Sequence, residues 1–247
     1  MRKFWQTEWQ GIQFSDFIKP SSTKLADVDF YNSFYQVLFH RFSGYQDLDR
    51  GWTDSKDTIA NWIAEQLPAG VNVLSVGCGL GYIEQKLLKE HGSRIDLHVS
   101  DYATDALRWL REVIPAERIH DPTGKGLDGL HFDLIYLSAV DYALNDKDLV
   151  KLLYELSRRL SKDGRLMILS GSYLDYQFSL IHLIKELIKA VLDNIGWWPR
   201  GQFWGWCRNR DDYRSIMDRV GLVSVNDGFI QDGDGREYWI SGIVDAS

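Results

Sequence analysis

Three glycines at alternate positions, followed at a distance by an aspartate, are the residues whose types and spacing best suit binding chemistry. Gly77, Gly79 and Gly81 come directly after the predicted buried strand 73–76. Glycine has no Cβ, so it adopts positive φ and lets a ligand lie against the backbone. Asp101 ends the next apolar run, 20 residues past Gly81. A backbone turn paired with a carboxylate at this distance suits a nucleoside, whose ribose hydroxyls donate to the acid.

The glycine spacing separates this turn from two phosphate-binding motifs. The dinucleotide motif G-x-G-x-x-G/A needs glycine or alanine where this chain has Tyr82, and no Gly-Lys-Ser/Thr of a P-loop occurs. The observed G-x-G-x-G, with Cys78 between its first two glycines, resembles motif I of the class I S-adenosylmethionine-dependent methyltransferases. The resemblance implies that the turn holds the methionine part of S-adenosylmethionine and that Asp101 holds its ribose.

The rest of the chain alternates apolar runs with amphipathic stretches, which is typical of a parallel sheet covered by helices. This order is similar to that of the same family over roughly residues 55–171 and again near the C-terminus. We therefore expect an α/β fold with a doubly wound, mostly parallel, seven-stranded Rossmann-like sheet and an antiparallel C-terminal hairpin. The predicted strands are 94–101, 118–120, 132–138, 165–170, 222–230 and 236–244, and the predicted helices are 29–42, 58–67, 102–113, 149–160, 177–195 and 211–220.

The 247 residues fit a single domain of four parts. We expect an N-terminal helical lid (1–55), a cofactor-binding core (56–171), an acceptor-side insertion (172–210) and a C-terminal helix with hairpin (211–247). The net charge of −7, without a long basic run, argues against nucleic-acid partners. Two cysteines form neither a disulfide framework nor a metal-ligand cluster. No signal peptide and no spanning apolar stretch is recognised, so a cytoplasmic protein is expected.

One position departs from the family pattern. The family usually has an acid two residues before the first glycine, which orients the methionine end of the cofactor, and here that position is Ser75. Glu84, in the first turn of the next helix, is an alternative acid, although complementing the helix dipole is the simpler interpretation. The resemblance further implies cofactor contacts near the ends of the strands, from Ser75, Cys78, Tyr102, Asp121 and Ser138.

Aromatic residues gather outside the predicted sheet. The segment 29–42 has them at helical spacing, and in related enzymes such a helix closes over the cofactor. Tyr31 and Arg41 are then expected at the cofactor and Tyr35 at the acceptor, while the alternative is a stripe packed against the sheet. Trp204 and Trp206 of the insertion would line an acceptor pocket suited to sugars or flat aromatic rings. The alternatives are a packed cap, a homodimer interface or a membrane-surface helix.

Methylation of a hydroxyl needs a general base near the methyl group. Asp141, just past the strand 132–138, is the first choice, and His120 and His182 are further candidates. Tyr142 follows Asp141 and is expected to contact the substrate. The sequence Ala-Val-Asp-Tyr lacks the prolines of the Asn/Asp-Pro-Pro-Tyr/Phe motif found in amide nitrogen methyltransferases. No metal is expected, because Asp101 is assigned to the ribose.

The aromatic residues before the glycine turn, and W-x-W-x-R before D-Y-R, resemble methyltransferases of bacterial polysaccharide and natural-product pathways. The resemblance implies a small-molecule or glycan O-methyltransferase that uses S-adenosylmethionine. The sequence leaves two alternatives open. One is an enzyme that methylates nitrogen in a small molecule. The other is a subunit that binds the cofactor but is catalytically silent and serves a partner, which the serine at position 75 and the large insertion would explain.

Overall fold

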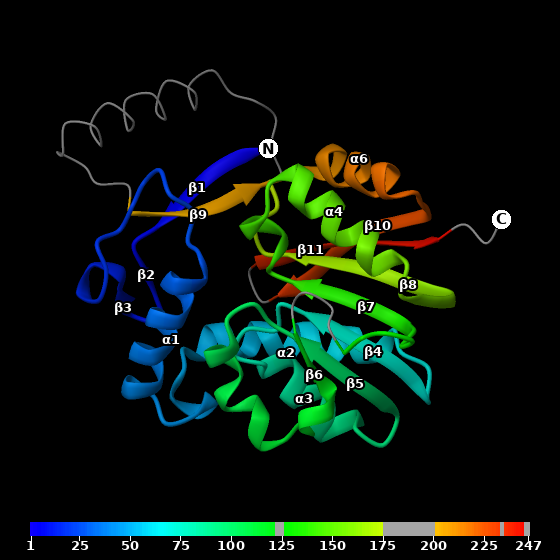
Figure 1. Cartoon of the computed structure of the whole chain (residues 1–247), viewed down its shortest axis with the longest axis horizontal. Helices are drawn as coiled ribbons and strands as arrows, with labels where there is room; N and C mark the ends of the chain where they lie inside the picture. Colours follow the sequence, from blue (N-terminus) through cyan, green and yellow to red (C-terminus); the bar gives the residue numbers. More distant parts are fainter. Residues whose placement is uncertain (122–125, 175–200, 233–234, 245–247) are drawn as a thin grey trace.

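The computed structural model describes residues 1–121, 126–174, 201–232 and 235–244. At its centre lies a seven-stranded sheet in the order β6-β5-β4-β7-β8-β11-β10 (Figure 1). β11 is antiparallel to both of its neighbours, and the other neighbouring pairs are parallel. The predicted doubly wound sheet with a C-terminal hairpin is confirmed. The strands are Val71–Val76 (β4), Ile95–Ser100 (β5), Ile119–His120 (β6), Phe132–Ser138 (β7), Leu160–Ser170 (β8), Leu222–Asp232 (β10) and Gly235–Val244 (β11).

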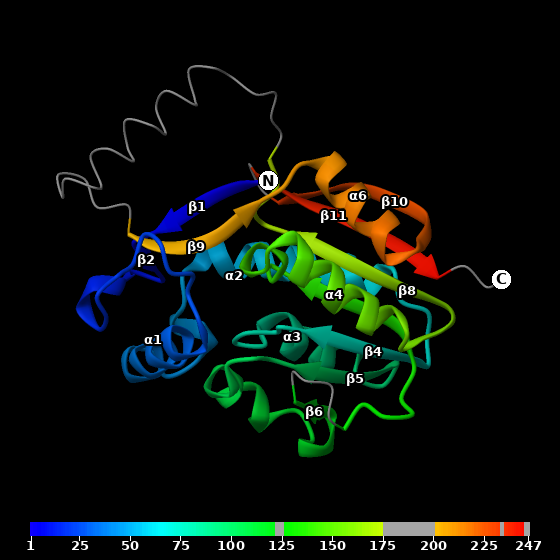
Figure 2. The same ribbon diagram turned by 45° about the horizontal axis from the view of Figure 1, so that its top comes forward.

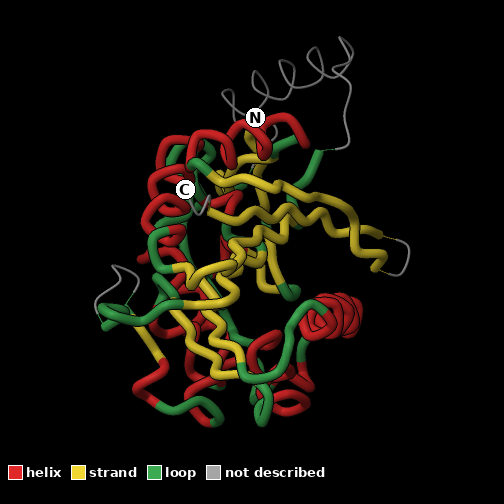
Figure 3. Tube along the Cα trace, turned by 90° about the vertical axis from the view of Figure 1, so that its right-hand side faces the viewer, coloured by secondary structure: helices red, strands yellow, loops and turns green. Residues whose placement is uncertain are grey.

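Helices cover both faces of this sheet (Figure 3). Side chains of a strand alternate between its faces, so Val73 and Leu74 of β4 belong to two separate hydrophobic cores. Val73 packs in the core with residues of α2 and α3, and Leu74 in the core with residues of α4 and α6. In the described ranges, no helix is long and apolar enough to cross a membrane. The four helices are Arg50–Glu65 (α2), Tyr82–His91 (α3), Asp146–Ser157 (α4) and Arg210–Val220 (α6).

Three predicted helices differ from those in the structure. α4 lies three residues earlier than the predicted helix 149–160. α2 begins at Arg50 rather than at residue 58, because the side chain of Asp49 accepts a hydrogen bond from the Trp52 amide and caps the helix there. The predicted helix 102–113 is wrong: this segment forms two short 3₁₀ helices, η3 (Thr104–Arg108) and η4 (Leu110–Glu112). The chain leaves β5 in a turn, since the side chain of Asp101 binds the Ala103 amide.

The N-terminal segment lies beyond the carboxyl ends of the parallel strands (Figures 1 and 2). It contains the predicted lid helix, α1 (Val28–Arg41), and a small hairpin of β2 (Glu8–Trp9) and β3 (Ile12–Gln13). β1 (Arg2–Gln6) pairs antiparallel with β9 (Gln202–Cys207), and the sequence predicted neither strand. This pairing joins the N-terminal segment to the end of the predicted insertion. The predicted helix 177–195 lies outside the described residues.

Candidate functional site

The glycine-rich turn joins β4 to α3 in a conformation that glycine adopts most readily. The φ angles of Gly77, Gly79 and Gly81 are +71°, +56° and +74°. Space is also short, because a Cβ on Gly77 would lie 2.3 Å from Cγ2 of Val140. A Cβ on Gly81 would lie 2.5 Å from Cδ2 of Leu110. The turn is therefore fixed between the segments that follow β7 and β5.

Asp101 closes the turn from the end of β5. Its Oδ2 accepts a hydrogen bond of 2.7 Å from the Gly79 amide, and its Oδ1 accepts one of 2.7 Å from the Ala103 amide. Burial raises the pKa of the Asp101 carboxyl, although both hydrogen bonds act in the opposite direction. Burial likewise raises the pKa of the Cys78 thiol, which therefore stays protonated. The structure thus brings the predicted ribose-binding acid to the turn.

A second buried carboxyl, that of Glu84, adjoins the same turn. Only 2% of Glu84 is exposed, and its Oε1 accepts hydrogen bonds of 2.6 Å from Ser75 Oγ and from the Tyr136 hydroxyl. Burial raises the pKa of this carboxyl. A role limited to the helix dipole does not account for these contacts. Tyr136 was not predicted from the sequence to be a site residue. The only local signal for it is a tyrosine among the mostly aliphatic residues of β7.

An aromatic wall, formed by Tyr31, Tyr35, Tyr142 and Trp204, stands over the turn. The Trp204 ring centroid lies 5.5 Å from that of Tyr31 and 6.3 Å from that of Tyr142. The Tyr35 hydroxyl lies 3.4 Å from the point that a Cβ on Gly79 would occupy. Burial raises the pKa of each tyrosine, so these hydroxyls stay protonated and act as hydrogen-bonding groups rather than bases.

Two predicted site residues lie outside this wall. Arg41 Nη1 donates a hydrogen bond of 2.6 Å to the carbonyl oxygen of Gly11, and the guanidinium group stands 5.4 Å from the centroid of the Phe42 ring. Trp206 packs against Phe203, with ring centroids 5.1 Å apart. Both side chains are thus engaged away from the turn.

Asp141, the first choice for a general base, is fully buried, and its Oδ1 has no hydrogen-bond partner in the described residues. Its Oδ2 accepts hydrogen bonds from the Tyr213 hydroxyl and, at 3.0 Å, from Ser170 Oγ. The buried guanidinium of Arg208 donates to the backbone oxygen of Asp141 at 2.7 Å. This geometry fits a supporting role for the 3₁₀ helix η6 (Asp141–Ala143), which carries Tyr142 into the wall, rather than contact with an acceptor.

His120, the second candidate base, is paired with another histidine. Its Nε2 lies 2.7 Å from Nδ1 of His98, and the two rings stack at 17°. The parallel pairing of β5 with β6 sets the two side chains together. His182 lies outside the described residues.

The remaining predicted contacts lie at the carboxyl ends of the strands. Tyr102 is 65% exposed and Asp121 is exposed, so both border the open side of the site. Ser138 ends β7, and its buried Oγ has no hydrogen-bond partner in the described part of the chain. In that same part, no group of three or more His, Cys, Asp and Glu side chains is arranged to hold a metal ion.

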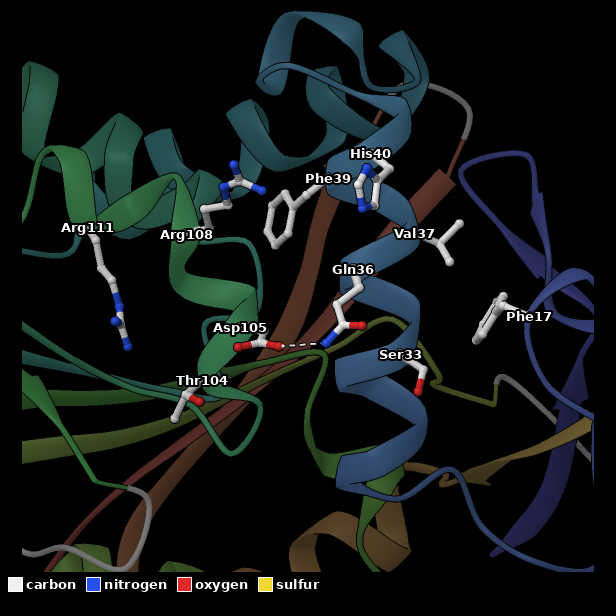
Figure 4. Close-up of a pocket in the computed structure, with 10 residues that line it drawn as sticks. All are labelled: Phe17, Ser33, Gln36, Val37, Phe39, His40, Thr104, Asp105, Arg108 and Arg111. Carbon is white, nitrogen blue, oxygen red and sulfur yellow. Dashed lines mark hydrogen bonds between the residues drawn. The ribbon is translucent and has the colours of Figure 1, made fainter.

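A surface groove of about 740 Å³ separates α1 from η3 and η4 (Figure 4). Gln36 donates a hydrogen bond of 3.5 Å to Asp105 across it, and the Arg108 guanidinium stands 5.5 Å from the centroid of the Phe39 ring. Phe39 in turn stacks on Tyr35, with centroids 6.2 Å apart. The residues lining the groove include none of the glycine turn, so the groove adjoins the aromatic wall without opening onto the turn.

Comparison with known proteins gives a fold but no sequence relative: no family model and no curated protein matches the chain. Magnesium protoporphyrin IX methyltransferase from Synechocystis PCC 6803, with bound SAH, is 18% identical over 88% of this chain and 97% of its own, with a TM-score of 0.58. Human N-acetylserotonin methyltransferase, in complex with SAM, is 15% identical over 94% of this chain and 63% of its own, with a TM-score of 0.56.

A third similar structure is a methyltransferase of calicheamicin biosynthesis in its SAH-bound form. It is 16% identical over 94% of this chain and 66% of its own, with a TM-score of 0.58. The chain thus spans about two thirds of the length of the last two proteins. Sheet order, glycine turn and these similarities agree: the chain has the fold of the class I S-adenosylmethionine-dependent methyltransferases.

Proposed function

We propose that this protein binds S-adenosylmethionine at the glycine-rich turn and transfers its methyl group to a hydroxyl of a small molecule or glycan. The main support for this proposal is the acidic character of the site. Two buried carboxyls, Asp101 and Glu84, adjoin the turn, and neither forms an ion pair with a basic side chain of the described residues. Such a site repels a pyrophosphate and attracts a cation. S-adenosylmethionine carries a sulfonium and an ammonium group.

The residues around the turn fit this cofactor. Each oxygen of Asp101 accepts one backbone hydrogen bond and retains a lone pair for a ribose hydroxyl. Ser138 Oγ offers a buried donor that the described residues leave unused. Tyr102 and Asp121, on the open side, would border the adenine. The SAM- or SAH-bound structures with the same fold support this choice of cofactor.

Bound S-adenosylmethionine would supply a methyl group on a positively charged sulfur. The aromatic wall would exclude water and hold a flat acceptor, and its hydroxyls would orient the acceptor oxygen. Alignment alone can lower the barrier by about 7–11 kcal/mol in favourable cases. Asp141 is fully buried and His120 is paired with His98, which leaves His182 as the remaining candidate base. A phenolic hydroxyl, which ionises more easily than an aliphatic one, would depend least on a base.

The parts of the chain would divide these tasks. Residues 1–55 would act as the lid, since α1 brings Tyr35 over Gly79. Residues 172–210 would form the acceptor side, since β9 carries Trp204 into the aromatic wall. The core 56–171 would hold the cofactor, and 211–247 would complete the sheet.

Calorimetric titration of S-adenosylmethionine and SAH into the wild type and Asp101→Ala tests the cofactor. We expect the wild type to bind both and the variant to bind at least about tenfold more weakly, since a carboxylate–hydroxyl bond is lost. Transfer of labelled methyl to phenols and glycans then tests the reaction. Transfer only to nitrogen would refute the hydroxyl acceptor. Binding without turnover, together with copurification of a stoichiometric partner, would favour the silent-subunit alternative.

A further inference from the structure

Glu84 places a carboxyl group where the protein alone does not compensate a negative charge. Removing a carboxylate from water costs several kcal/mol unless a cation or strong hydrogen bonds offset the loss. The donors to Glu84 are the neutral hydroxyls of Ser75 and Tyr136 and its own backbone amide, and in the described chain no basic side chain pairs with it. The charge of Asp101 raises the pKa of Glu84 further. A cationic ligand would relieve this cost.

The carboxyl is also oriented as a binding group. Both hydroxyls bond to the same oxygen, Oε1, which fixes the orientation of the carboxyl group. Ser75 lies at 1% exposure near the end of β4, and Glu84 reaches it from the first turn of α3. The carboxyl therefore stands where the strand enters the glycine turn, and Asp101 stands at the end of the neighbouring strand.

We propose that Glu84 binds the ammonium group of the aminoacyl end of S-adenosylmethionine, with Ser75 and Tyr136 holding its carboxylate in position. This inference rests on the proposed function. Two acids would then bind different groups of the cofactor: Asp101 the ribose and Glu84 the ammonium. This arrangement also explains how the chain lacks an acid at position 75: the helix supplies the carboxylate and the strand supplies the hydroxyl that orients it.

Two ligands separate this role from a general one. SAH contains the aminoacyl group, whereas 5′-methylthioadenosine lacks it and keeps the adenosine. In calorimetric titrations of the full chain, Glu84→Gln should weaken SAH binding by about 10–100-fold, the value of a charged hydrogen bond. Binding of 5′-methylthioadenosine should stay within about twofold, which is below the loss of one such bond. Asp101→Asn, the matched control, should weaken both ligands.

The thermal midpoint of unfolding gives a second readout. A purely structural role for Glu84 predicts that its replacement lowers the midpoint, whereas a binding role predicts that it does not. The glutamine keeps an oxygen for Ser75 and Tyr136 but removes the buried charge, so the ligand-free Glu84→Gln variant should melt at or above the wild-type temperature. A variant that melts lower and loses both ligands equally would overturn the inference. Tyr136→Phe keeps the test open if Glu84→Gln does not fold: it removes one orienting hydroxyl and should weaken SAH alone.

Exchanging the two groups gives the strictest test. Ser75→Asp with Glu84→Ser places the carboxylate on the strand and the hydroxyl on the helix. We expect this double variant to bind SAH more tightly than Glu84→Ser alone, with 5′-methylthioadenosine unaffected by either. No recovery would count against the inference. If the folded wild type binds neither ligand, the proposed function itself fails; if it binds both and Glu84→Gln affects them equally, only this inference fails.

Discussion

His98 on β5 and His120 on β6 meet with their ring planes inclined by only 17°, with Nδ1 of the first 2.7 Å from Nε2 of the second. This hydrogen bond needs one ring nitrogen as donor and the other as acceptor, so it is lost when both rings are protonated. Burial lowers the pKa of both histidines, and the charge of Arg118 near His98 and of Arg159 near His120 acts in the same direction. Asp96, 3.6 Å from His98, opposes this shift.

The pair should make folding sensitive to acid. Because the folded-state pKa values lie below the unfolded value of about 6.5, the unfolded chain takes up protons first as the pH falls. Stability from the pair is therefore full above pH 6.5 and declines below it, by at most about 1.4 kcal/mol per pH unit for each proton. Urea unfolding between pH 7.5 and 5 should show a smaller pH slope in His120→Gln than in the wild type.

The difference between the two proteins isolates the histidines, because the buried acids titrate in both. His131→Gln is the matched control, since His131 is exposed. Equal slopes in the wild type and His120→Gln would contradict a coupled, buried pair.

The sequence predicted the part of the site that local patterns determine. Glycines after one buried strand and Asp101 after the next meet because parallel neighbouring strands end at the same edge. The aromatic spacing of 29–42 likewise predicted α1 within one residue at each end. These features depend on the spacing of apolar and aromatic residues and on the residues that begin or end an element, and both lie within a few residues of each other.

The missed features depend on distant residues. β1 pairs Arg2 with Cys207, and no local pattern near either residue indicates the other. Asp141 follows a strand as a catalytic acid would, yet its Oδ2 accepts a hydrogen bond from the hydroxyl of Tyr213, which is 72 residues away. Glu84 was undervalued for the same reason: the hydroxyl of Tyr136, 52 residues away, turns its carboxyl inward.

The tight turn at Gly77 provides a prediction about stability. Gly77→Ala would combine a left-handed φ with a Cβ 2.3 Å from the Val140 side chain. We expect a loss of about 2–5 kcal/mol in the free energy of unfolding, from backbone strain and overpacking together. Gly70→Ala is the matched control, because Gly70 has φ +78° with nothing within 4 Å of its Cβ position and should lose only about 1–2 kcal/mol.

Urea denaturation of the two variants measures this difference. Adding Val140→Ala to Gly77→Ala should recover part of the loss, since it removes the atoms in the way. Equal losses in Gly77→Ala and Gly70→Ala would mean that Val140 does not constrain the turn.

Arg208 is a fully buried cation that links the segments around η6. Its guanidinium donates to the carbonyl oxygens of Asp141 and Leu144, at 2.7 and 2.6 Å, and to Asp146 Oδ1 at 2.9 Å. Arg208→Met should lower the free energy of unfolding by about 3–5 kcal/mol, because it leaves buried acceptors without a donor. Arg50→Met, whose side chain is 93% exposed and 3.7 Å from Asp54, should cost less than about 1 kcal/mol.

Arg208→Lys should recover little of this stability. A lysine ammonium lacks the planar fork that reaches three acceptors at once. Thermal unfolding of the three variants at neutral pH checks the order. A lysine variant as stable as the wild type would show that charge alone, and not the geometry of the fork, holds this region.

Variants of Tyr213 and Asp141 distinguish a structural role of the Asp141 carboxyl from a catalytic one. If Asp141 supports η6, Tyr213→Phe should lower the free energy of unfolding by about 1–3 kcal/mol, because a buried carboxyl oxygen loses a donor. Asp141→Asn should then change kcat by less than about tenfold, whereas removal of a general base would lower it by about 10²–10⁴-fold. Urea denaturation gives the first quantity, and label transfer to an identified acceptor gives the second. A large loss of kcat in a stable Asp141→Asn variant would restore Asp141 as the base and require the wall to open around it during the reaction.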